Sequence, residues 1–270
     1  MSTTFLRSIV RETWPAALTL LVALVTWEGA VRILQPPAYL VPAPSAVAVY
    51  LAANLPSLLH DIGSTVVEIA IVFGLSVLIG IPLGAAAYRS RLFRRTVYPL
   101  LVASQTFPKL AVGPLFIVWF GFGQLPIVLL GILLTFFAIT STTLVGMQEV
   151  RPESIDLARI MGLSGRRRFL RIELPQALPS VFGGLRLAST LAVVGVVVAE
   201  FLGASSGLGY RIVNATGMAN TPALFSCLVL LIVIGLLFYG AIALAEWLLL
   251  PWRRPAVFRV SAGTAPASAS

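Results

Sequence analysis

Long apolar stretches dominate the chain and are separated by short polar segments. No charged residue occurs from Leu110 to Gln148 or from Ile212 to Ala245. A helix needs about 20 apolar residues to cross the hydrocarbon core of a bilayer, so stretches of this length predict membrane spans. The 270 residues are 58% hydrophobic with a mean hydropathy of +0.96, which leaves too little polar surface for a soluble domain. We therefore expect an all-α membrane protein.

The pattern predicts six transmembrane helices, with approximate bounds 14–34, 62–88, 96–120, 125–147, 178–202 and 221–250. A short interfacial helix is expected from Ala46 to Leu59, and Pro108 interrupts the third span. The start of the chain could also be a secretory signal. However, a charged pair one turn apart, Glu28 and Arg32, and the lack of a cleavage site favour a retained helix.

This division gives one membrane domain, residues 14–252, between two cytoplasmic ends. Residues 1–13 form an N-terminal segment, and residues 253–270, which are rich in Ala, Ser and Pro, form a tail expected to be disordered. With both termini inside, 15 of the 19 basic residues fall in cytoplasmic segments. This asymmetry is what the positive-inside rule requires. The net charge of +9 thus reflects topology and contact with an anionic leaflet rather than nucleic-acid binding.

The longest charged segment is Arg151–Pro175, which we call the elbow. Pro152 suits the first position of a helix, and Gly162 can adopt the left-handed conformation that ends one. A second short helix is expected from Ser164 as its cap to Pro175 as its stop. Two short amphipathic helices joined by a glycine turn predict a rigid cytoplasmic docking element. The alternative is a basic hairpin that lies on anionic lipid.

Several chemistries are excluded by what the sequence lacks. The only lysine is Lys109, followed by leucine, so no GxxxxGK[ST] phosphate loop exists. The single histidine, His60, and the single cysteine, Cys227, cannot supply a metal cluster. The serines of Gly203–Gly207 have no candidate base beside them, which makes an intramembrane hydrolase the least favoured class. We expect no catalytic residue, bound metal or cofactor in this chain.

Three ionisable residues fall within or near the predicted spans: Glu68, Lys109 and Glu200. Each would cost about 2.5–3.5 kcal/mol if it faced lipid at the bilayer centre, so each is expected to face the bundle interior or a cavity. Two interpretations stay open. They line or gate a pathway, or they form internal ion pairs such as Lys109 with Glu200. Glu28 and Arg32 are expected to pair structurally, given their i, i+4 spacing.

The elbow carries a known spacing. Asp156-Leu157-Ala158, three residues, Gly162, nine residues and Ile172-Glu173-Leu174-Pro175 resemble EAA-x3-G-x9-I-x-LP, the signature of permease subunits of binding-protein-dependent ABC importers. Asp replaces Glu and Leu replaces Ala at the first two positions.

Further segments resemble the nitrate/sulfonate/taurine-type permeases: Trp27-Glu28, Val41–Ser45 and Phe107–Gly123. Val197–Tyr210 and the closing EWLLLPW are most similar to members assigned to thiamine-pyrimidine precursors or riboflavin.

The resemblance implies a type I ABC importer permease (MetI-like) fold with six transmembrane helices and cytoplasmic coupling helices, in a bacterial inner membrane. It implies that a pair of separate ATPase subunits uses the ATP, that a second permease copy forms a homodimer, and that an extracytoplasmic binding protein delivers a small organic solute. The implied ATPase contacts are Asp156, Ala158, Gly162, Ile172, Leu174 and Pro175. The rival class is a self-sufficient secondary transporter or channel, for which no inverted repeat is evident.

Overall fold

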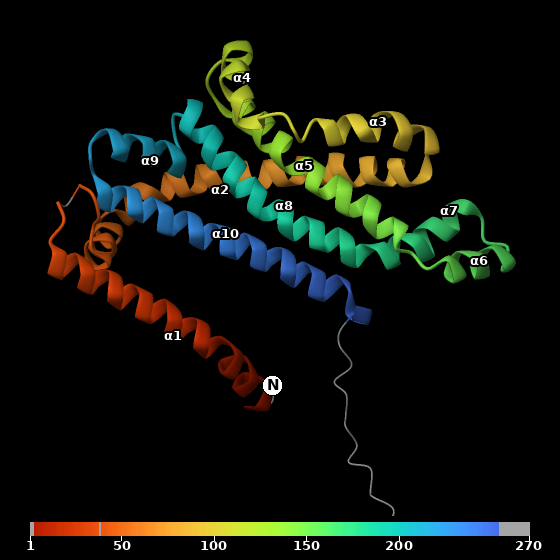
Figure 1. The fold of residues 1–270 in the computed structure, drawn as a ribbon, viewed down its shortest axis with the longest axis horizontal. Helices are drawn as coiled ribbons and strands as arrows, with labels where there is room; N and C mark the ends of the chain where they lie inside the picture. Colours follow the sequence, from red (N-terminus) through yellow and green to blue (C-terminus); the bar gives the residue numbers. More distant parts are fainter. Residues whose placement is uncertain (1–2, 38, 254–270) are drawn as a thin grey trace, which may run out of the picture.

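The computed structural model describes residues 3–37 and 39–253, a helical bundle without strands in this part of the chain (Figure 1). The long helices are α1 (Thr3–Leu34), α2 (Pro44–Arg89), α5 (Gln124–Gln148), α8 (Leu174–Gly203) and α10 (Thr221–Leu249). The shorter elements are α3 (Arg91–Ala103), the 3₁₀ helix η1 (Lys109–Val112), α4 (Gly113–Phe120), α6 (Pro152–Ile160), α7 (Gly165–Arg168), the π-helix η2 (Phe169–Glu173), α9 (Leu208–Gly217) and the 3₁₀ helix η3 (Pro251–Arg253).

The core forms where α5 packs between α2 and α8. Glycines bring these backbones together. A Cβ added at Gly80 would lie 2.8 Å from the Phe136 carbonyl oxygen, and one at Gly84 would lie 2.7 Å from that of Thr140. The GIPLG segment, Gly80–Gly84, therefore acts as a small-xxx-small contact between α2 and α5.

Five helical segments in the described residues are long and apolar enough to span a membrane. The predicted interruption of the third span, 96–120, at Pro108 is confirmed. The span divides into α3 and the short apolar run of η1 and α4, with a non-helical stretch between Ala103 and Lys109. Pro108 lies directly before η1, with a ψ of 84° that is not helical. Its ring disfavours helical backbone at the preceding residue and removes an N–H, so the break occurs here.

The predicted interfacial helix 46–59 is not separate from the second span. Both belong to α2, whose 46 residues include Pro56. At 1.5 Å per residue such a helix is about 70 Å long, more than twice the hydrocarbon thickness of about 30 Å. Part of α2 therefore extends beyond the bilayer.

Helix α1 begins at Thr3, ahead of the predicted Trp14, and its apolar stretch Ala17–Leu34 has no buried residue. Over most of its length α1 runs apart from the other long helices (Figure 1). The predicted pair of Glu28 with Arg32 is confirmed, with 2.7 Å between Oε1 and Nε. Glu28 also accepts hydrogen bonds from the backbone N–H and the hydroxyl of Ser45, at the start of α2. Apart from Arg253 in η3, the predicted tail lies outside the described residues.

Candidate functional site

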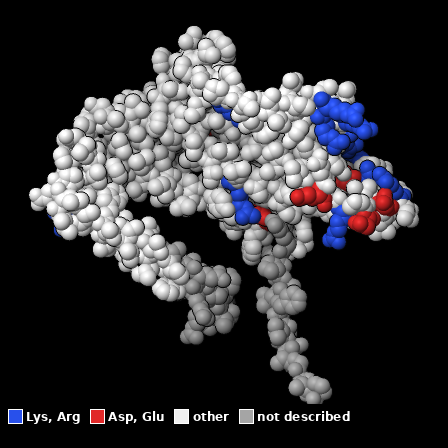
Figure 2. Space-filling view, viewed as in Figure 1, with Lys and Arg blue, Asp and Glu red and all other residues white. Residues whose placement is uncertain are grey.

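The elbow projects from one end of the bundle as α6, α7 and η2 (Figure 1). Charged side chains gather at the same end, in contrast to the uncharged surface over much of the bundle (Figure 2). A charge-rich projection from an apolar bundle indicates a part of the molecule that lies outside the hydrocarbon.

The turn of the elbow is fixed by Gly162, whose φ of +68° is in the left-handed region. Leu163 N donates to Ala158 O at 3.0 Å, and Gly162 N donates to Arg159 O at 2.9 Å. These two bonds form the Schellman motif that closes a helix end. The predicted end of the first elbow helix is thus confirmed, and the direction of α6 relative to the second elbow helix is defined by this turn.

The second elbow helix does not stop at Pro175. Ser164 occupies the predicted cap position with extended backbone, although its hydroxyl caps nothing. From Gly165 the helix continues through the π-turn of η2 into α8, and Pro175 lies in the first turn of α8. Within η2, Leu174 N bonds to the carbonyl five residues back, at Phe169. This shift in hydrogen bonding accommodates the N–H that proline lacks, so the helix passes the proline instead of ending there.

Contacts of η2 fasten the elbow to the bundle. Arg168 Nε donates to Glu173 Oε1 at 2.6 Å, and Glu173 is buried. The guanidinium of Arg89, at the end of α2, lies 5.4 Å from the ring centre of Phe169, within the range of a cation–π contact. The elbow is therefore joined to α8 through continuous helix and to α2 through a side-chain contact.

One exposed face of α6 is apolar. Leu157, Ile160 and Met161 are 59%, 84% and 68% exposed, and their i, i+3, i+4 spacing places them on one helical face. Exposed apolar groups on a projecting charged element are typical of a surface that a partner covers. The sequence interpretation did not single out these three residues, although their spacing could have shown them.

The six predicted contact residues divide between surface and interior. Asp156 is exposed and bonds to Arg159 at 2.8 Å, and Gly162 is also exposed. Ala158 is fully buried, whereas three residues are partly buried: Ile172, Leu174 and Pro175. The structure thus exposes Asp156 and Gly162 and turns Ala158 inward.

Glu200 lies in a buried polar cluster at the beginning of α9. Thr65 donates its hydroxyl proton to Glu200 Oε1 at 2.7 Å, and Gly209 N donates to Glu200 Oε2. Leu208 N donates to Thr65 Oγ1 at 2.9 Å. Because the first N–H groups of a helix have no partner within the helix, these bonds cap α9 with a carboxylate at its positive end. Glu68 is buried beside Glu200, and its Oε2 has no hydrogen-bond partner.

Lys109 does not join this cluster. Its Nζ donates to Gln105 Oε1 at 2.5 Å, and it makes no ion pair with Glu200, so the suggested pairing of the two is wrong. The reason is positional, since Lys109 begins η1 after the break in the third span, whereas Glu200 faces α2 and α9.

The sequence interpretation missed a second carboxylate at α9. Asp61 accepts from Gly207 N at 3.0 Å through Oδ1 and from Arg211 Nε at 2.5 Å through Oδ2. This hydrogen bond raises the pKa of the Arg211 guanidinium further above its ordinary value. Asp61 and Arg211 are 150 residues apart, so no local pattern could pair them.

The apolar bundle and its projecting, charged elbow define a helical membrane subunit of a transport machine. Residues 76–247 match the family described as binding-protein-dependent transport system inner membrane component. The match covers more than half of the chain, and the chain belongs to this family. It is the permease of an ABC importer and not an enzyme, since ATP is hydrolysed by a separate subunit.

Curated relatives of this chain are also named as transport permeases. The chain is 37% identical over 235 residues to the formylaminopyrimidine transport permease protein ThiX of Halalkalibacterium halodurans, covering 87% of this chain and 94% of the relative. It is 36% identical to the riboflavin transport system permease protein RibX of Chloroflexus aurantiacus, covering 91% and 94%. Identity to the putative aliphatic sulfonates transport permease protein SsuC of Bacillus subtilis is 37%, covering 67% and 64%.

Solved structures confirm the predicted fold. A chain of the MetNI methionine ABC transporter, in an inward-facing conformation, superposes with a TM-score of 0.61 at 19% identity, covering 68% of this chain and 92% of that one. At this identity the likeness concerns the fold alone. The assignment to the family also sets aside the secondary transporter or channel.

Proposed function

We propose that this permease imports a small nitrogen heterocycle and is driven through its elbow by a separate pair of ATPases. The observation that carries the coupling is the exposed apolar face of α6, formed by Leu157, Ile160 and Met161, beside the exposed carboxylate of Asp156. An ATPase groove that buries this face would recover hydrophobic energy of about 25 cal/mol per Å². The turn at Gly162 fixes the direction of α6, and the second elbow helix continues into α8. A force on the elbow is therefore transmitted to the membrane spans.

The orientation and the assembly form part of the same proposal. The elbow faces the cytoplasm together with both termini, because this arrangement places most arginines inside. Two copies of this chain form a homodimer on two ATPases, and an extracytoplasmic binding protein delivers the solute. The family description, a component of a binding-protein-dependent system of the inner membrane, supports the binding protein and the location.

The class of solute is proposed from the relatives. Those named for formylaminopyrimidine and riboflavin align over 87% and 91% of this chain, whereas the sulfonate relative aligns over 67%. A neutral nitrogen heterocycle is therefore favoured over a sulfonate. Lys109 remains the candidate for a gate or pathway residue, while Glu200 acts from inside the bundle by holding α9 in place, with Glu68 buried beside it.

The coupling is tested by charge reversal, Asp156→Arg. The Asp156–Arg159 pair is 63% exposed on both sides, and exposed pairs contribute about 0–1 kcal/mol, so the variant should insert and fold normally. We expect the affinity-purified variant to retain severalfold less ATPase subunit than the native permease. ATP-dependent uptake of formylaminopyrimidine should fall in parallel.

Glu153→Arg, a reversal in the first turn of α6, is the matched control for added positive charge. Equal recovery of the ATPase with Asp156→Arg and with native protein would contradict docking at this carboxylate. Uptake of an alkanesulfonate but not of the heterocycle would contradict the solute class and leave the coupling intact.

A further inference from the structure

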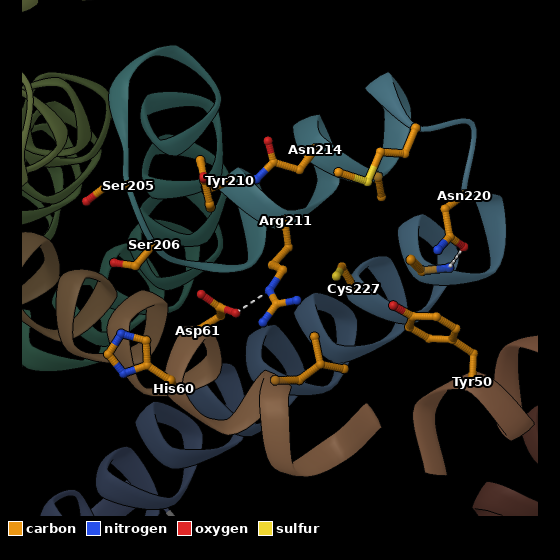
Figure 3. Close-up of a pocket in the computed structure, with 14 residues that line it drawn as sticks. Tyr50, His60, Asp61, Ser205, Ser206, Tyr210, Arg211, Asn214, Asn220 and Cys227 are labelled. Carbon is orange, nitrogen blue, oxygen red and sulfur yellow. Dashed lines mark hydrogen bonds and ion pairs between the residues drawn. The ribbon is translucent and has the colours of Figure 1, made fainter. Parts of the chain in front are cut away.

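A cavity of about 390 Å³ opens where α2, α9 and α10 meet, at the end of the bundle away from the elbow (Figures 1 and 3). Tyr50, His60 and Asp61 line it from α2, and Arg211 and Asn214 line it from α9. Its volume is within the range of roughly 300–1,000 Å³ that is typical of small-molecule sites. It is separate from the elbow and from the buried Glu68–Glu200 pair.

The charges at this cavity are already balanced. Arg211 stands at its centre, with Nε bound to Asp61 and Nη2 bound to the Ser57 carbonyl oxygen at 3.0 Å (Figure 3). Asp61 is buried and also accepts a hydrogen bond from Gly207 N, so both of its oxygens are already bonded within the protein. Among the described residues that line the cavity, no other Lys, Arg, Asp or Glu is present. An anion such as a sulfonate would meet a guanidinium whose charge Asp61 already neutralises, so its desolvation would be poorly compensated.

The remaining lining suits an uncharged ring. Tyr210 and Tyr50 bring phenol groups, Asn214 brings an amide, and Arg211, whose side chain is 38% exposed, turns part of its guanidinium toward the space (Figure 3). These groups can bond to ring nitrogens, amino groups and carbonyl oxygens. Buried apolar side chains such as Leu58 complete the wall and can pack against a ring face. A few placed polar groups on an apolar wall are the usual make-up of a small-molecule pocket.

We propose that this cavity is a receiving site, within a single permease chain, for a neutral single-ring heterocycle of the aminopyrimidine class. The proposal rests on the proposed function for the direction of transport. On that orientation the cavity opens to the extracytoplasmic side, where the solute arrives. Asp61 belongs to both the cavity and the cap of α9, because its two oxygens hold Arg211 and Gly207 N. A ligand on Arg211 therefore acts directly on the contact that positions α9.

The test measures equilibrium binding of radiolabelled formylaminopyrimidine to the assembled permease–ATPase complex in nanodiscs, without binding protein. Tyr210→Phe and Asn214→Ala each remove one polar group and should weaken binding by about tenfold, the loss expected for one hydrogen bond to a ligand. Tyr98→Phe makes the same chemical change on α3, where Tyr98 stacks on Phe137, and should bind as the native complex does. An alkanesulfonate should not compete.

Unchanged binding in both variants, or competition by the sulfonate, overturns the proposal. If the two variants instead weaken only the attachment of the binding protein, the cavity is a docking site for that protein and the proposal also falls. Binding is measured independently of uptake, which separates the two claims. If both variants take up the heterocycle at the native rate, the proposed function stands and the receiving site is rejected. If the native complex binds the heterocycle but does not take it up, the site stands and the proposed function is rejected.

Discussion

Replacement of Gly162 by valine tests whether the shape of the elbow transmits force. Gly162 has a φ of +68°, and a Cβ built on it meets no atom within 4 Å. The variant therefore causes no collision, and its cost is purely conformational. It acts on the turn that closes α6 and leaves the packing of the spans untouched.

The size of the effect follows from the backbone. An L-residue in the left-handed region costs roughly 1–2 kcal/mol, and a β-branched side chain is among the least tolerant. That energy corresponds to a factor of about 5–30 in the equilibrium constant between the native and the relaxed turn. When the turn relaxes, the bonds from Leu163 N to Ala158 O and from Gly162 N to Arg159 O are lost. The apolar face of α6 then points in another direction while the bundle persists.

The assay is ATP-dependent uptake into vesicles that contain the complete importer, together with ATPase activity. We expect Gly162→Val to insert at the native level and to lower uptake by about 5–30-fold, in line with the change in population. Gly162→Asn should retain more uptake, because asparagine tolerates the left-handed region. Gly165→Val is the matched control, since Gly165 also has open space at its Cβ but no positive φ. Equal uptake by the two valine variants would refute the reasoning.

Three further predictions concern the bundle. Glu200→Ala removes the carboxylate that holds Gly209 N and should lower stability by about 1–3 kcal/mol, seen as a lower thermal midpoint in detergent; an unchanged midpoint contradicts the capping role. Gly84→Leu should cost about 1–3 kcal/mol or more by overpacking against α5, whereas Gly74→Leu, with nothing within 4 Å, should be tolerated; similar midpoints would argue against the close contact. Lys109→Ala should leave the protein folded, because its Nζ bonds to the side chain of Gln105, an exposed residue four positions earlier, and should alter uptake if the residue gates the path; normal uptake removes it from the pathway.

Features governed by neighbouring residues could be predicted from sequence alone. Membrane residence followed from the length of the apolar stretches, since about 20 apolar residues suffice to cross the hydrocarbon core. The end of α6 followed from Gly162, because a helix C-terminus is decided within a few residues. In each case the physical cause is local, so the sequence already contains it.

Pro175 marks the limit of that local reasoning. Proline removes one N–H, which predicts an end to the helix, but the outcome depends on whether the neighbouring hydrogen bonds can shift. In η2 the backbone N–H of Leu174 bonds to the carbonyl five residues back instead of four, and the helix continues into α8. Helix α2 likewise continues through Pro56 and Pro82.

By itself, the sequence determined that this is a helical membrane protein with a charged elbow, because apolar length and backbone preferences act over short distances. Only the tertiary structure decided the partners of the buried charges. Glu200 bonds to Thr65 across 135 residues and Arg211 to Asp61 across 150, whereas the expected pairing of Glu200 with Lys109 does not form. Burial obliges an ionisable group to find a partner, but which partner is within reach depends on how α2, α8 and α9 come together.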